Sequence, residues 1–127
     1  MKEITGIMVD LYHLKKIDFM GYKVSKDNPY TYHHCYLKKC DNGKETIANG
    51  AILTKNAHNY LHIIEGRDPE LYEYINNVLK QINEQGFAPL KRQLLAIDYI
   101  LKIFEQEHQN DISKKRKKLI KDEYLRR

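Results

Sequence analysis

The most regular hydrophobic pattern lies in the second half of the chain. An Asp-Pro-Glu sequence beginning at Asp68 is a typical helix start, and apolar residues follow it every three or four positions up to Gly86. This pattern predicts a helix over about residues 69–85. The same spacing after Pro89 predicts another helix over about residues 89–108. Both apolar stripes are typical of faces that pack into a hydrophobic core.

Shorter and more mixed patterns occupy the N-terminal part of the chain. The apolar residues between Ile4 and Tyr12 have helical spacing, although Gly6 and Val9 leave a strand or an irregular start open. Residues 17–24 mix aromatic and β-branched side chains, and we expect them to be extended. The chain therefore begins with a predicted helix or strand that an extended segment follows.

A strand–turn–strand–helix order is expected in the middle of the chain. Residues 30–37 are rich in strand formers, an Asp-Asn-Gly turn sequence follows them, and the apolar residues 51–53 are a candidate for the returning strand. A helix over about residues 56–65 should come next, with Thr54 or Asn56 as its cap. These elements predict an α+β fold in which a short β-hairpin is flanked by several helices.

The composition fits a single globular domain over residues 1–112. The chain has 127 residues, of which 42% are hydrophobic and 31% are charged, so it can bury one core. Its two cysteines, Cys35 and Cys40, are too few for a disulfide framework and are expected to be ordinary thiols. Because no apolar run approaches the length of a membrane span and the chain opens on no signal-like run, we expect a cytoplasmic protein with no membrane partner. The oligomeric state stays open.

The positive charge of the chain is concentrated near its C-terminal end. Residues 113–127 contain eight basic and two acidic side chains, whereas the net charge of the whole chain is +5. Such a stretch attracts phosphate polyanions through the release of counterions, and it is equally typical of a solvated helix end. The residues of this basic tail that we predict to contact nucleic acid are Lys114, Lys115, Arg116, Lys117 and Lys118.

Four of the six histidines lie within thirty residues of one another. His58 and His62 are four positions apart in a predicted helix, so both imidazoles project from one face. This spacing suits two ligands of one cation, although alone it is weak evidence. His33 and His34 lie in the predicted strand, and a loop and a return strand connect this pair to the helix. That arrangement is the layout of a ββα unit.

These residues and their spacing resemble the HNH, or ββα-metal, nuclease family. The interval from His34 to Asn49 is fifteen residues, and the interval from Asn49 to His58 is nine. With a further four residues to His62, the spacing is similar to that of the colicin-type DNase branch. The stretch over residues 30–65 also looks like small HNH proteins of phages and Gram-positive bacteria. The resemblance implies a ββα-metal motif in a bacterial or phage-encoded intracellular protein.

The resemblance also implies a role for each matched residue. His33, His58 and His62 would hold one divalent metal ion, and zinc, nickel, magnesium and manganese are all candidates. His34 would be the general base that takes a proton from the attacking water. Asn49 would brace the loop and hold the backbone of His34 through its side-chain amide. The implied reaction is hydrolysis of phosphodiester bonds in nucleic acid, and the habit of the family favours DNA over RNA.

Two features of the sequence require a structural explanation. Adjacent strand residues face opposite sides, so His33 and His34 do not both face the helix in a flat strand. Either the strand bulges or ends there, or the site wraps around its edge. Many members of the family also carry Cys-x-x-Cys pairs that bind a structural zinc, and this chain has no such pair. We therefore assign no second metal.

A metal-dependent endonuclease is the function that the sequence favours. Lys38, Lys39 and Lys44 flank the predicted loop and are the candidate phosphate contacts beside the site. One alternative is a nucleic-acid-binding or regulatory protein on the same scaffold that does not cleave, but it leaves His34 without a role. Another is a small structural zinc module that mediates protein contacts, which also leaves the basic tail unexplained.

Overall fold

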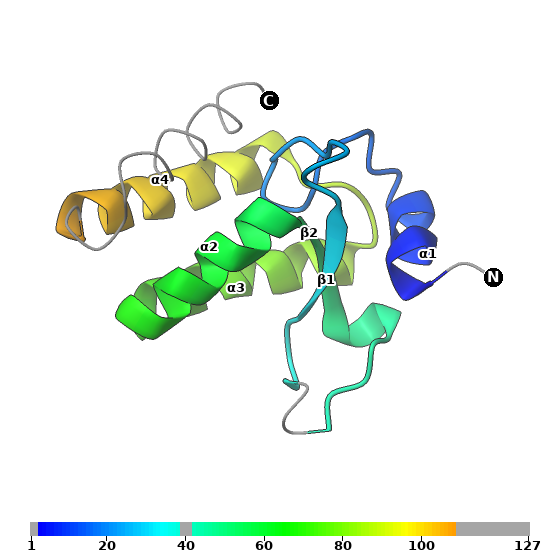
Figure 1. Ribbon diagram of the computed structural model, residues 1–127, viewed down its shortest axis with the longest axis horizontal. Helices are drawn as coiled ribbons and strands as arrows, with labels where there is room; N and C mark the ends of the chain where they lie inside the picture. Colours follow the sequence, from blue (N-terminus) through cyan, green and yellow to red (C-terminus); the bar gives the residue numbers. More distant parts are fainter. Residues whose placement is uncertain (1–2, 39–41, 109–127) are drawn as a thin grey trace.

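The computed structural model describes residues 3–38 and 42–108, and a short β-hairpin lies among its helices (Figure 1). The helices are α1 (Ile4–Leu11), α2 (Lys55–Arg67), α3 (Pro69–Gln85) and α4 (Lys91–Glu107), and the strands are β1 (Tyr30–His34) and β2 (Gly50–Thr54), with the short 3-10 helix η2 (Ile47–Asn49) before β2. The predicted α+β class is confirmed. The order strand, strand, helix is compatible with a ββα layout. Residues 109–127, which include the basic tail, lie outside the described residues.

The two antiparallel strands bring the middle of the chain together. In their register His33 pairs with Ala51 and His34 pairs with Gly50. All five residues of β2 are buried, because helices pack on it from both sides. In Figure 1, α1 lies on one side of the hairpin, and α2 and α3 lie on the other. The strand predicted over residues 30–37 ends earlier, at His34, where the chain turns into the loop.

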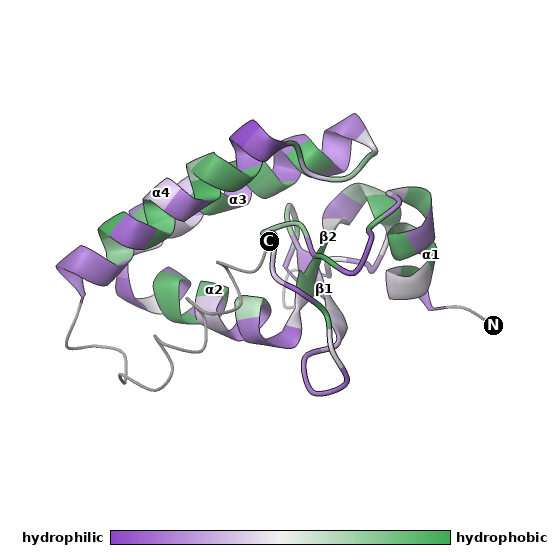
Figure 2. Cartoon of the chain, turned by 90° about the horizontal axis from the view of Figure 1, so that it is seen from above, coloured by the Kyte–Doolittle hydropathy of each residue, from purple (hydrophilic) through white to green (hydrophobic). Residues whose placement is uncertain are grey.

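The ends of α3 lie where the sequence predicts them. The carboxylate of Asp68 accepts a hydrogen bond from the backbone N–H of Leu71 at 3.2 Å, which satisfies a donor in the first turn. Gly86 ends the helix with a φ angle of 78°, a left-handed conformation that glycine adopts without strain. Alternating hydrophilic and hydrophobic segments along α3 and α4 show that both helices are amphipathic (Figure 2). Their apolar faces contribute Ile75, Leu79, Ile82, Ile97, Leu101 and Phe104 to the core.

The start of α2 is fixed by residues outside the helix. Thr54 is its N-cap, but the Thr54 side chain makes no capping hydrogen bond. The side-chain oxygen of Asn28 instead accepts from the backbone N–H of Asn56 at 2.8 Å. The Thr54 hydroxyl donates to the buried carboxylate of Asp18 at 2.9 Å. The helix that presents the two spaced histidines is therefore anchored to the N-terminal segment.

Residues 17–24, which we expect to be extended, are interrupted by a turn and form no regular strand. This part of the chain forms only an isolated bridge between Ile17 and Lys23, and its backbone turns around Asp18. The Asp18 carboxylate accepts hydrogen bonds from the N–H groups of Met20 and Tyr22, both at 2.9 Å. Burial raises the pKa of Asp18 to about 6 against the effect of its hydrogen bonds.

The N-terminal alternative between helix and strand is resolved in favour of a helix. Met8 in α1 is fully buried, and α1 contacts both strands of the hairpin. Among the helices of the described residues, none combines the length and the apolar character that crossing a membrane requires.

Candidate metal centre

Three of the predicted site residues lie together between β1 and α2. The ring centroids of His58 and His62 are 4.7 Å apart, and the His33 ring lies 5.5 Å from His58 and 6.2 Å from His62. One ring nitrogen from each histidine lies within 4.8 Å of the other two, close enough for one metal ion to contact all three. His33 is buried, His58 is half-buried and His62 is exposed, so the group opens to solvent on the side of His62.

Asn76 in α3 determines which nitrogen of the His33 ring carries the proton. The Asn76 amide nitrogen donates to the carbonyl of Cys35 at 2.9 Å, which turns its oxygen toward His33. That oxygen lies 2.9 Å from His33 Nε2. Because an amide oxygen only accepts, Nε2 carries the proton and Nδ1 is the nitrogen left to bind a cation.

The His58 ring is oriented by a hydroxyl group on β1. Thr31 Oγ1 lies 2.8 Å from His58 Nδ1, and the same hydroxyl donates to the carbonyl of Leu53 at 2.8 Å. Since a hydroxyl has a single proton, Thr31 must accept from His58, which places the proton on Nδ1. His58 Nε2 is therefore the nitrogen available to a cation.

The exposed ligand, His62, has a carboxylate partner one turn further along α2. Its Nδ1 lies 3.2 Å from Glu65 Oε1, and the other oxygen of Glu65 pairs with the Lys38 ammonium group. Although burial raises the pKa of Glu65, the hydrogen bonds from Lys38 and His62 lower it overall below its ordinary value. An ionised carboxylate only accepts, so His62 also presents Nε2.

The electrostatic surroundings keep the inner histidines neutral. Burial lowers the pKa of His33 to about 4, although the hydrogen bond to Asn76 opposes this shift. Burial also lowers the pKa of His58 to about 4, and the neighbouring histidines, His34 among them, act in the same direction. A metal ion binds the unprotonated nitrogen of a neutral ring, so neither histidine needs to release a proton to bind the ion at neutral pH.

The donor set fits one divalent transition-metal ion. Three imidazole nitrogens are a common protein ligand set for zinc, and each of the three rings hydrogen-bonds through its other nitrogen, as ligating histidines usually do. Imidazole is also a good ligand of nickel. Within the described residues the group holds three protein ligands, which leaves coordination positions for water or phosphate. The sequence predicted these three histidines as a group, and the structure brings them together.

His34 lies on the opposite face of β1 from the three ligands. Its ring meets the ring of Tyr32 edge to face, with centroids 4.9 Å apart. The alternation of strand side chains explains this placement, because Tyr32 and His34 are two residues apart. His34 is the last residue of β1, so of the alternatives that the sequence left open, a bulge, a strand end or a site that wraps the strand edge, the strand does end at this residue. Its Nε2 atom is buried and has no hydrogen-bond partner among the described residues.

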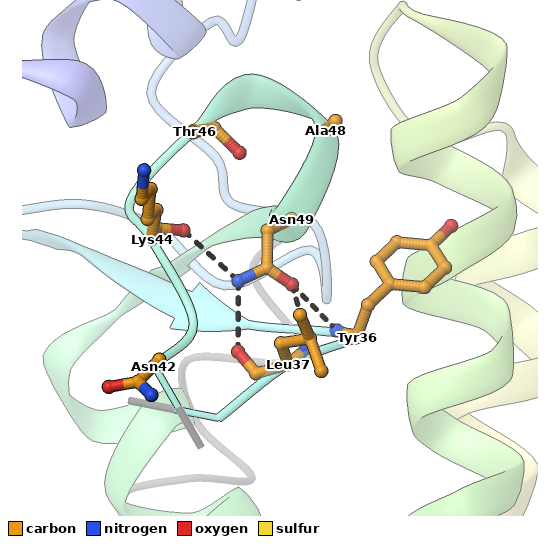
Figure 3. A pocket seen from close by; sticks show the side chains of 7 residues that line it. All are labelled: Tyr36, Leu37, Asn42, Lys44, Thr46, Ala48 and Asn49. Carbon is orange, nitrogen blue, oxygen red and sulfur yellow. Dashed lines mark hydrogen bonds between the residues drawn. The ribbon is translucent and has the colours of Figure 1, made fainter. Parts of the chain in front are cut away.

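Asn49 braces the loop, as the resemblance implies, but its side chain does not bind the backbone of His34 as expected. Its side-chain oxygen accepts from the N–H groups of Tyr36 at 3.0 Å and Leu37 at 2.8 Å, and its amide nitrogen donates to the carbonyls of Leu37 at 2.9 Å and Lys44 at 3.0 Å (Figure 3). The side chain therefore holds the residues after His34 and not the backbone of His34 itself. The Asn49 carbonyl also accepts from Cys35 N–H at 2.7 Å.

The predicted phosphate contacts have different surroundings. Lys38 is exposed but paired with Glu65, so a phosphate would compete with that carboxylate for it. Lys44 lines an open pocket of about 400 Å³ in the loop, beside Tyr36 and Asn49 (Figure 3). Lys39 and the tail residues 114–118 lie outside the described residues.

Cys35 is a buried free thiol, and burial raises its pKa to about 12. This agrees with the ordinary, unreactive thiol that we expect. Cys40 is not among the described residues.

Sequence reasoning missed the residues that orient the ligands, namely Thr31, Glu65 and Asn76. Glu65 had a local signal, because it follows His62 by three positions in the same helix. Asn76 had a weaker signal, as a polar residue next to Ile75 in a predicted core stripe.

A second group of possible ligands lies where α4 ends near the start of α3. It consists of Asp68, Glu107 and His108. Asp68 caps α3 with one oxygen and lies 3.1 Å from His108 Nε2 with the other, so protein partners explain both oxygens. We assign no ion to this group.

Comparison of the chain with family models, with curated proteins and with solved structures finds no match in any of the three.

Proposed function

We propose that this protein is a metal-dependent endonuclease of the HNH type that hydrolyses phosphodiester bonds, with DNA as its substrate. The observation that carries this proposal is the group of His33, His58 and His62, whose ligand nitrogens meet between a β-hairpin and the helix that follows it. His34 is the next strand residue after the first ligand. A metal site with open positions, whose first ligand is followed in the sequence by an additional histidine, suits hydrolysis better than storage or purely structural binding.

In this proposal each residue has a defined task. His33, His58 and His62 hold one divalent cation, which when bound stabilises the negative charge that develops on the phosphoryl oxygens. His34 accepts the proton of the attacking water, and Asn49 keeps the loop that follows His34 in place. Lys44 contributes positive charge beside the loop pocket for the phosphate backbone.

A structural zinc module is the less favoured alternative, because such sites are closed by four protein ligands. The described group contains three, and the nearby Cys35 thiol donates no ligand to it. A non-cleaving nucleic-acid-binding protein would share the metal site and the positive charge. Catalytic turnover is the property that separates this alternative from the proposed nuclease.

The test is cleavage of supercoiled plasmid by the full chain after treatment with a chelator. Nickel, zinc, manganese and magnesium are then added one at a time. We expect cleavage to return with at least one metal and to be lost in the His58→Ala variant. The matched control is His13→Ala, which changes an exposed histidine outside the site and should leave cleavage unchanged. Metal binding without cleavage under any of these conditions would favour the non-cleaving alternative.

A further inference from the structure

Asn76 is a buried polar side chain in the middle of α3, outside the strand–strand–helix unit that carries the histidines. Only 3% of its surface is exposed, and Ile75 beside it is fully buried. Its amide links α3 to the end of β1 through two hydrogen bonds of 2.9 Å. The amide oxygen accepts from His33 Nε2, and the amide nitrogen donates to the carbonyl of Cys35, which follows the strand. Burying an amide costs free energy unless its partners are in place, so this contact is specific and not incidental.

The two hydrogen bonds of Asn76 have different consequences. The bond to the Cys35 carbonyl fixes which end of the amide faces the histidine. The bond from His33 Nε2 then determines the tautomer of that ring and leaves Nδ1 unprotonated. His58 and His62 have the reverse arrangement, because Thr31 and Glu65 engage their Nδ1 atoms. The three ligands are thus prepared to bind one cation through one Nδ1 and two Nε2 atoms.

We propose that Asn76 is a positioning residue of the metal centre, which keeps the His33 proton on Nε2 and thereby presents Nδ1 to the cation. The proposal rests on the metal site described under the proposed function and extends that site to α3. Hydrogen-bond partners of ligating histidines commonly change metal affinity by roughly 10- to 100-fold when they are removed. A similar loss is the expected consequence of removing the Asn76 amide.

The same helix offers a matched control. Asn83 lies seven residues after Asn76, is 8% exposed, and donates its amide to the carbonyls of Ile47 and Gly50, both at 2.6 Å. It contacts no histidine through any of these bonds. Asn76→Leu and Asn83→Leu therefore both remove a buried amide of α3 that bonds to the hairpin region, but only Asn76→Leu removes the partner of a ligand.

The first measurement needs no variant and no activity. Nitrogen-15 NMR of the histidine rings in the metal-free chain should show His33 protonated at Nε2, and the zinc-loaded chain should show His33 bound through Nδ1. Zinc bound through Nε2 of His33, or a metal-free ring protonated at Nδ1, would overturn the proposal. Either result would leave the proposed nuclease function standing, because cleavage depends on the cation and not on this choice of nitrogen.

The second measurement compares zinc affinity by competition with a chromophoric chelator. We expect Asn76→Leu to lose roughly 10- to 100-fold in affinity, and Asn83→Leu to change by less than about 3-fold. Asn76→Asp retains an acceptor for His33 while it loses the donor to Cys35, so it should keep the tautomer and most of the affinity even where Asn76→Leu folds poorly. Equal losses in Asn76→Leu and Asn83→Leu, or a loss in Asn76→Asp as large as that in Asn76→Leu, would assign Asn76 a structural role alone.

Discussion

The hydroxyl of Thr31 and the Nδ1 atom of His58 lie 2.8 Å apart, and this contact crosses from β1 to α2. Thr31 donates its own proton to Leu53, so it holds the His58 ring with Nε2 free. A residue two positions before the first ligand therefore orients the second. This relationship makes the strand more than a support for His33, because it fixes two of the three ligands of the proposed metal centre.

Replacing Thr31 by valine should weaken metal binding without unfolding the protein. Valine has nearly the same shape but cannot accept the His58 proton, so the ring loses its fixed orientation. We expect zinc affinity to fall by roughly 10-fold in a chelator competition. Thr46→Val changes an exposed threonine outside the ligand group and is the control. Equal affinities for the two variants would contradict the orienting role of Thr31.

Replacing His34 by alanine should separate the general base from the metal ligands. Cleavage of plasmid should fall by roughly 100-fold or more, the range for removal of a general base, while zinc binding stays nearly unchanged. His62→Ala should reduce both cleavage and zinc affinity, because His62 is one of the three proposed ligands. Cleavage at the wild-type rate by the His34→Ala protein would remove the proposed mechanism.

The stability of the metal-free protein should depend on pH through His58. Its pKa of about 4 in the folded protein lies below the ordinary value of 6.5, so the unfolded chain binds more protons between these values. The contribution to stability is complete above pH 6.5 and is lost as the pH falls toward 4. The free energy of unfolding of the wild type should therefore decrease more than that of His58→Gln over this interval, by about 1 to 2 kcal/mol.

Urea denaturation of both proteins with a chelator present, at several pH values, measures this difference. The pKa of Asp18 is raised to about 6 and acts in the opposite direction, but Asp18 is present in both proteins and its effect cancels. A difference between the two proteins that is the same at pH 7 and pH 4.5 would show that His58 titrates normally.

Removing the Asp18 carboxylate should destabilise the fold at the start of α2. Asp18→Ala leaves the buried N–H groups of Met20, Tyr22 and Thr54 without their acceptor. We expect a loss of about 2 to 4 kcal/mol in the free energy of unfolding at pH 7. The control, Asp27→Ala, changes an exposed aspartate of the same segment and should stay within about 0.5 kcal/mol of the wild type. A similar small effect of both substitutions would contradict the anchoring role of Asp18.

Removing residues 113–127 should weaken nucleic-acid binding on all sequences alike. These residues carry eight basic and two acidic side chains, so their loss reduces the number of counterions released on binding. The plot of log affinity against log salt concentration should become shallower. An unchanged slope in a truncated protein with an intact circular dichroism spectrum would assign the tail to another role.

The helix ends and the spacing of the histidine pair could be predicted from the sequence, because they depend on residues that are close together in the chain. The start of α3 at Asp68 and its end at Gly86 follow from local backbone chemistry, and the His58–His62 pair follows from helical spacing. Residues 17–24 have the composition of a strand, but they lack a partner strand and turn around Asp18 instead. Composition alone does not reveal whether a partner is present.

The remaining features depend on contacts between distant parts of the chain. Asn76 meets His33 across 43 positions of sequence, and Asn28 caps α2 across 28 positions, so neither contact has a local signature. The bonding pattern of Asn49 likewise depends on the path of the loop, which explains why its role in bracing was foreseen but its partners were not.

Asp68 is at once the residue that ends α2 and the residue that begins α3. No further residue separates α2, which carries His58 and His62, from α3, which carries Asn76. The direction in which α3 presents Asn76 therefore depends on the number of residues between Asp68 and Asn76. With 3.6 residues per turn, one residue inserted between Asp68 and Asn76 would rotate the rest of α3 by about 100° and turn the amide away from His33. A change of chain length between His62 and Asn76 would therefore separate the amide from His33, whereas a change after Gly86 would leave this helix pair intact.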